Sequence, residues 1–134
     1  MLAYIVAYVV SGLAFVAADA AWLTLAGPRL YRPAIGPLLN DKVNAAPAVV
    51  FYLLYLGGVL FLAVTPALRT GQWRAAALNG LVLGVVAYGT YDLTNQATLR
   101  LWSVRLTVAD MAWGGAVTAL AATLGFLAAR RAGG

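Results

Sequence analysis

Residues 2–26 read LAYIVAYVVSGLAFVAADAAWLTLA and carry one charged side chain, that of Asp19. A hydrocarbon core about 30 Å thick needs roughly 20 apolar residues per helical crossing, so this stretch is long enough to span a membrane. Three similar apolar runs follow, at residues 47–68, 75–93 and 106–129. Backbone polar groups inside lipid must be satisfied within the spanning structure, which favours helices in a chain of this length. We therefore predict an all-α integral membrane bundle of four transmembrane helices in a single domain, residues 1–134.

The composition of the chain agrees with a membrane location. Hydrophobic residues make up 63% of the 134 residues and charged residues only 10%, against about 25% charged in ordinary soluble domains. The absence of Cys and His excludes disulfides, thiolate nucleophiles and every histidine-based catalytic or metal site. We expect no cofactor.

The positive charge of the chain lies outside the apolar runs. The formal net charge is +5, but every basic residue lies between or beyond these runs, as expected for side chains that anchor helices at lipid headgroups. We therefore expect the lipid bilayer as the partner, and no nucleic acid. With both chain ends on one side, the basic residues divide four against five. We predict cytoplasmic ends, although so even a division also fits dual topology and an antiparallel homodimer.

Three of the four acidic residues lie inside apolar runs: Asp19, Asp92 and Asp110. An ionised carboxylate deep in a bilayer costs about 2.5–3.5 kcal/mol on the insertion scale, so each one must face protein, water or an opposite charge. At 1.5 Å per residue, Asp19 and Asp92 lie about 26 Å along the first and third helices, and Asp110 about 6 Å along the oppositely directed fourth. All three carboxylates are therefore predicted at the same depth, near the same membrane face.

Each intramembrane acid has polar or aromatic companions at helical spacing. The motif Asp-x-x-Trp occurs twice, in the first and fourth helices, and the third helix presents Tyr and Asn side chains around its acid. We predict one inward-facing chamber that opens towards the proline-bearing connection of residues 27–46. The predicted ligand-binding or ion-binding residues are Asp19, Asp92, Asp110, Asn95, Tyr88, Tyr91, Trp22 and Trp113.

Two interpretations of these acids remain open. As structural groups, they would bond to Tyr, Trp and Asn donors, or pair with Arg100 and Arg105, and so lock the bundle together. As functional groups, they would bind a cation, take up protons or hold a polar headgroup between aromatic walls. We favour the functional interpretation because intramembrane carboxylates are functional by default. The sequence does not identify a metal.

A GxxxG spacing at Gly80 and Gly84 predicts close helix packing, either within the bundle or against a partner helix.

A longer motif connects the chain to a known family. The segment Tyr91-Asp92-Leu93-Thr94-Asn95-Gln96-Ala97-Thr98-Leu99, together with Asp110-Met111-Ala112-Trp113-Gly114 and Asp19 to Trp22, resembles the bacterial membrane protein family known as domain of unknown function 2177. The similarity extends over nearly the whole chain. It implies a small four-helix inner-membrane protein with no assigned activity, in which Asp92 and Asn95 are family-defining positions.

Three functions are compatible with these observations. The first is a small transporter or channel-like protein of the bacterial inner membrane, in which the three acids bind a cation, a proton or a cationic substrate. The second is an accessory or structural subunit of a larger membrane complex, in which the GxxxG pair packs against partner helices. The third is a lipid-modifying enzyme that uses paired carboxylates with Mg²⁺. It ranks last because no phosphate motif supports it, so we do not expect an enzyme.

Overall fold

The computed structural model describes residues 1–133 and contains four helices that are long and apolar enough to cross a membrane. The first begins as α1 (Leu2–Ala26) and continues through a π-helical turn, η1 (Gly27–Tyr31), into α2 (Arg32–Ile35) and the 3₁₀ turn η2 (Gly36–Leu38). The second comprises α3 (Ala45–Val59), the π-helical turn η3 (Leu60–Val64) and α4 (Thr65–Thr70). The third and fourth are α5 (Trp73–Thr98) and α6 (Val104–Gly133). The predicted all-α fold with four membrane-spanning helices is confirmed, and the protein is a multi-pass membrane protein.

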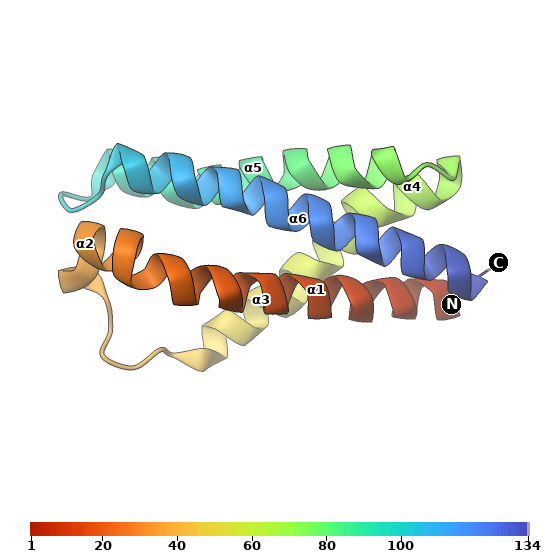
Figure 1. Cartoon of the computed structure of the whole chain (residues 1–134), viewed down its shortest axis with the longest axis horizontal. Helices are drawn as coiled ribbons and strands as arrows, with labels where there is room; N and C mark the ends of the chain where they lie inside the picture. The colour runs from red at the N-terminus through yellow and green to blue at the C-terminus, as the bar shows by residue number, and fades with distance from the viewer. Residues whose placement is uncertain (134) are drawn as a thin grey trace.

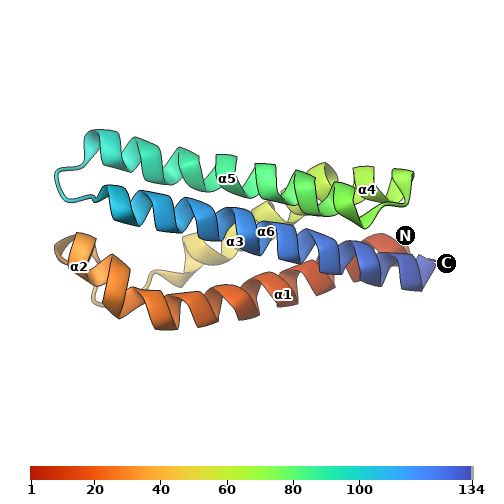
Figure 2. The ribbon, with the colours of Figure 1, turned by 45° about the horizontal axis from the view of Figure 1, so that its top comes forward.

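Helix α6 lies at the centre of the bundle although it comes last in the sequence. It packs along both α1 and α5, and Figures 1 and 2 show it between them over most of its length. The chain runs up and down through the bundle, so that both termini lie at one end. Helix α2 and the α5–α6 connection lie at the other end.

Small residues allow the close contacts of α6. Gly80 and Gly84 of α5 are buried against it, and a Cβ atom added at Gly80 would lie only 2.8 Å from the Thr118 carbonyl oxygen. Towards α1, Ser11 donates a hydrogen bond to the Ala121 carbonyl of α6 at 2.9 Å. Lipid gives helices no hydrophobic reason to associate, so close backbone approach and interhelical hydrogen bonds hold such bundles together. The GxxxG pair packs within the chain itself.

Proline residues alter the helices at two places instead of ending them. Pro28 and Pro33 lie within one continuous helix that runs from Leu2 to Leu38, and the π turn η1 comes just before Pro33. Of the predicted connection 27–46, only residues 39–44 lie outside a helix. Similarly, η3 widens the helix just before Pro66, and Thr65 donates its hydroxyl to the Leu60 carbonyl at 2.8 Å. A π turn accommodates the carbonyl group that proline leaves without a donor.

The two remaining connections are short. Gly71 ends α4 with a φ of 70°, a left-handed conformation that favours glycine. The carbonyl of Gly71 accepts a hydrogen bond from Arg130 at 2.7 Å, which ties the α4–α5 turn to α6. At the opposite end, α5 extends to Thr98, beyond the apolar run, and Ser103 caps α6 by accepting from the Leu106 N–H at 3.0 Å.

Large apolar side chains cover the outside of the bundle. They include Leu13, Leu54, Phe61, Val86 and Val108, each of which is largely exposed. An apolar exterior of this extent fits a lipid environment, where such surface needs no protein partner.

Candidate functional site

A cavity of about 1070 Å³ lies between the helices at the end of the bundle that holds α2. Its wall combines intramembrane carboxylates with aromatic side chains, and its rim includes the connection after η2. The lining comprises Asp19, Leu23, Tyr31, Arg32, Gly36, Leu39, Asn40, Asp41, Val43, Asn44, Pro47, Ala48, Phe51, Ala87, Tyr88, Tyr91 and Asp110. Residues from α1, α3, α5 and α6 all contribute, so the cavity exists only when all four spans are assembled.

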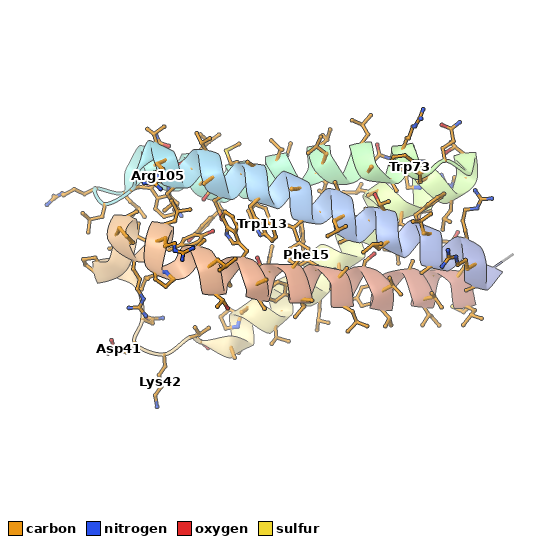
Figure 3. The ribbon with its side chains drawn as sticks, viewed as in Figure 1. Phe15, Asp41, Lys42, Trp73, Arg105 and Trp113 are labelled. Carbon is orange, nitrogen blue, oxygen red and sulfur yellow. The ribbon has the colours of Figure 1, made fainter. Side chains whose placement is uncertain are left out.

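Asp19 is held at the cavity wall by two neutral donors from other helices. Its side chain is 8% exposed. The Tyr52 hydroxyl of α3 donates to one carboxylate oxygen, and the indole N–H of Trp113 on α6 donates to the other at 3.2 Å. Figure 3 shows Trp113 in the space between α6 and α1. These bonds offset part of the desolvation of the carboxylate without adding a positive charge.

Asp110 is held in a similar way from the other side. It is 5% exposed and accepts a hydrogen bond from the Tyr31 hydroxyl of η1. That hydroxyl in turn accepts a bond of 2.9 Å from the indole N–H of Trp22. A chain of two donors therefore runs from α1 through η1 to the carboxylate on α6.

The two Asp-x-x-Trp motifs exchange donors across the α1–α6 contact. The indole N–H of Trp113 donates directly to Asp19. The indole N–H of Trp22 donates to the Tyr31 hydroxyl, which in turn donates to Asp110. The indole rings stack on each other, with 4.8 Å between centroids and 5° between planes. Asp and Trp three residues apart share a helix face, so antiparallel packing places each acid beside the other helix's indole. The two copies of the motif therefore meet across the same helix contact.

Asp92 differs from the other two acids. Its side chain has no exposed surface, and within the described residues neither carboxylate oxygen has a hydrogen-bond donor. The side-chain oxygen of Gln96, one turn later on α5, is also buried without a donor. Gly89, one turn before Asp92 on α5, packs against Met111 of α6, and this register brings the Asp92 carboxyl close to the carboxyl of Asp110. Asp92 does not line the cavity.

The remaining predicted residues occupy different surroundings. Tyr88 packs on Gly114, where any side chain would collide with its ring, and it lies near the charges of Asp19 and Asp110. Tyr91 lines the cavity and meets Trp102 edge-on at 5.5 Å. Asn95 is half-buried and outside the cavity lining.

Of the three predicted carboxylates, those of Asp92 and Asp110 lie together, and that of Asp19 lies apart from them. Asp92 contacts Asp110, whereas Asp19 binds Tyr52 and Trp113 and reaches the same cavity from α1. Within residues 1–133 no group of three acidic side chains is arranged to hold a metal ion. Arg100 and Arg105, the counter-charges expected from the sequence, are both exposed, and Figure 3 shows Arg105 at the end of the bundle that holds the α5–α6 connection.

The two hydroxyl donors of the site, Tyr31 and Tyr52, are not among the residues predicted from the sequence. Tyr31 lies 79 residues from Asp110, and Tyr52 lies 33 residues from Asp19. Tyr52 shares a helix face with Tyr55, whose hydroxyl bonds Thr118 at 2.8 Å. This Tyr-x-x-Tyr spacing in an apolar run was the available signal, because a buried phenol needs a polar partner.

Comparison with known proteins assigns the chain to a family. Residues 4–127 match the family model described as "Predicted membrane protein (DUF2177)". The chain belongs to this family. The match includes every residue of the cavity lining and both Asp-x-x-Trp motifs. No curated protein and no solved structure matches the chain. Membership in the DUF2177 family therefore supports the membrane location.

Proposed function

We propose that the protein is a small transporter or channel-like protein of the bacterial inner membrane that binds an organic cation in the cavity. The observation that carries the proposal is a cavity of about 1070 Å³ with two buried carboxylates, Asp19 and Asp110, in its wall. Small-molecule sites commonly occupy about 300–1,000 Å³, so the space suits a molecule larger than a bare ion.

The charges around the cavity support a positively charged ligand. Asp19, Asp110 and Asp41 line it against a single basic residue, Arg32, which is exposed at the rim. The hydrogen-bond donors to the two buried carboxylates are phenols and an indole, which leave the negative charge uncompensated. A carboxylate held at membrane depth without a counter-charge favours the entry of a cation.

The aromatic side chains support an organic cation over an inorganic one. Phe51, Tyr31, Tyr88 and Tyr91 line the same cavity. Aromatic faces attract cations by their quadrupole and bury apolar groups at the same time. Oxygen ligands arranged around a metal ion would be required for an inorganic site, and three acidic groups do not come together in residues 1–133.

The subunit and enzyme hypotheses have less support. The Gly80 and Gly84 pair, the main feature in favour of a partner helix, is buried against α6 of the same chain. A lipid-modifying reaction with Mg²⁺ would need a ligand set for the metal, and the described residues offer no such acidic cluster. The cation-binding function remains the proposal that the site supports best.

Calorimetry of the purified protein in mild detergent tests this proposal. Tetraphenylphosphonium and tetraphenylborate have nearly the same shape and opposite charges, so the cation should bind and the anion should not. Asp19→Asn and Asp110→Asn should each weaken cation binding at least tenfold, whereas the exposed Asp41→Asn should have a smaller effect. Equal binding of both ions, or unchanged cation affinity in both buried variants, would refute the proposal.

A further inference from the structure

The Asp92 carboxyl group is the most poorly satisfied polar group in the described part of the chain. It is completely buried, and neither of its oxygens receives a hydrogen bond. The buried oxygen of Gln96 also lacks a donor. Buried polar atoms in folded proteins are nearly always bonded, so a buried carboxyl group without any donor indicates that it carries a proton or holds a positively charged species.

The groups around Asp92 indicate whether the missing partner is a proton or a cation. The nearest of these groups is the carboxyl of Asp110 on α6, because Gly89, one turn before Asp92 on α5, packs against Met111 of α6. The hydroxyls of Tyr31 on η1 and Tyr91 on α5 are near enough to interact with the charge of Asp92. The Tyr31 hydroxyl already donates to Asp110. None of these neighbours is basic. Two ionised carboxylates as close as those of Asp92 and Asp110 repel each other strongly at low dielectric.

We propose that Asp92 and Asp110 share one proton, with Asp92 as the resting carrier that donates to the Asp110 carboxylate. One proton converts two repelling acceptors into a hydrogen-bonded pair with a single negative charge. A sodium ion fits less well, because Asp92 borders neither the cavity nor a third carboxylate. The proton needs no additional space.

The position of Asp92 and Asp110 provides a path for the proton to the cavity and couples its release to ligand binding. Asp110 lines the cavity and Asp92 does not, so the proton leaves the Asp92 oxygen, passes to Asp110 and then to water in the cavity. A cation bound beside Asp110 favours this step, because it stabilises the doubly ionised pair that remains. The protein would thereby exchange a proton for a cationic ligand. This exchange rests on the proposed function, whereas the shared proton does not.

Infrared spectroscopy tests the shared proton without any ligand. At neutral pH the wild-type protein should show the C=O stretching band of a protonated carboxylic acid, which shifts in D₂O. The sequence holds only four Asp and no Glu, so assignment is direct. Asp92→Asn, which keeps the size of the side chain and can still donate to Asp110, should remove the band, and the exposed Asp41→Asn should keep it. A wild-type spectrum without the band would overturn the proposal even if Asp92→Asn failed to fold.

Proton release on binding tests the exchange. Tetraphenylphosphonium added to wild-type protein in weakly buffered solution should release up to one proton per bound cation, and Asp92→Asn should bind without release. Binding to the wild type with no release would refute the exchange, whereas no binding at all would refute the proposed function and leave the infrared result intact. Sodium-dependent stability that is lost in Asp92→Asn would replace the shared proton with a sodium ion.

Discussion

The contact between α5 and α6 sets the position of Tyr88 and Asp92, and Gly84→Ala tests it directly. A Cβ atom added at Gly84 would lie 2.7 Å from the carbonyl carbon of Gly114 and closer still to its oxygen, whereas ordinary van der Waals contact begins at about 3.4 Å. Both atoms belong to helix backbones, so no side chain can rotate away. The two helices must separate by roughly 1 Å, which forfeits part of the dispersion energy along the contact.

Overpacking of this kind lowers the free energy of unfolding by about 1–3 kcal/mol. The higher helix propensity of alanine than of glycine raises it by up to about 1 kcal/mol. Gly57→Ala in α3 is the matched control, because an added Cβ there meets nothing within 4 Å. The difference between the two variants removes the propensity contribution. We expect Gly84→Ala to be less stable than Gly57→Ala by about 1–3 kcal/mol, a factor of roughly 5 to 150 in the unfolding equilibrium.

Unfolding by sodium dodecyl sulfate in mixed micelles, followed by far-ultraviolet circular dichroism, measures this difference. The Gly84 variant should also bind tetraphenylphosphonium more weakly, because separation of α5 from α6 displaces the cavity wall. Equal unfolding free energies in the two alanine variants would show that the backbones of α5 and α6 are not in close contact at Gly84.

Three further predictions concern the donors of the site and one turn. Tyr31→Phe removes the hydroxyl that bonds Asp110 and should lower the unfolding free energy by about 1–3 kcal/mol in the same titration; unchanged stability would argue against this bond. Trp113→Phe keeps an aromatic ring but loses the N–H donor to Asp19, so a loss of about 1–3 kcal/mol is expected, and a neutral result would count against the reciprocal arrangement. Gly71→Ala forces a left-handed conformation on alanine and should cost about 1–2 kcal/mol; an equally stable variant would show that the α4–α5 turn adopts another conformation.

The reciprocal arrangement of the two Asp-x-x-Trp motifs serves both structure and function. Each carboxylate is bonded well enough to remain in a membrane bundle, yet each keeps a surface on the cavity. The structural and functional interpretations of the acids therefore need not exclude one another. Neutral donors hold the acids in place, and the uncompensated charge is available to a ligand.

The amino-acid sequence by itself determined the four membrane-spanning helices and the burial of three acids within them. Apolar runs of sufficient length leave helices as the way to satisfy the backbone in lipid, so this conclusion needs no tertiary information. Helical spacing also predicted that each Asp shares a face with the Trp three residues later. The helical continuation through Pro28 and Pro33 was not evident, because a proline-rich segment usually ends a helix, whereas here the π-helical turn η1 accompanies its continuation.

Only the tertiary structure decided which groups meet. Hydropathy does not determine the order of the helices in space, and the last helix, α6, lies at the centre because its small residues let α1 and α5 approach it closely. That placement brings Asp92 against Asp110 and leaves Asp19 to the donors of α3 and α6. Periodicity fixes the face of one helix, whereas contacts between helices depend on the fit of side chains from distant parts of the chain.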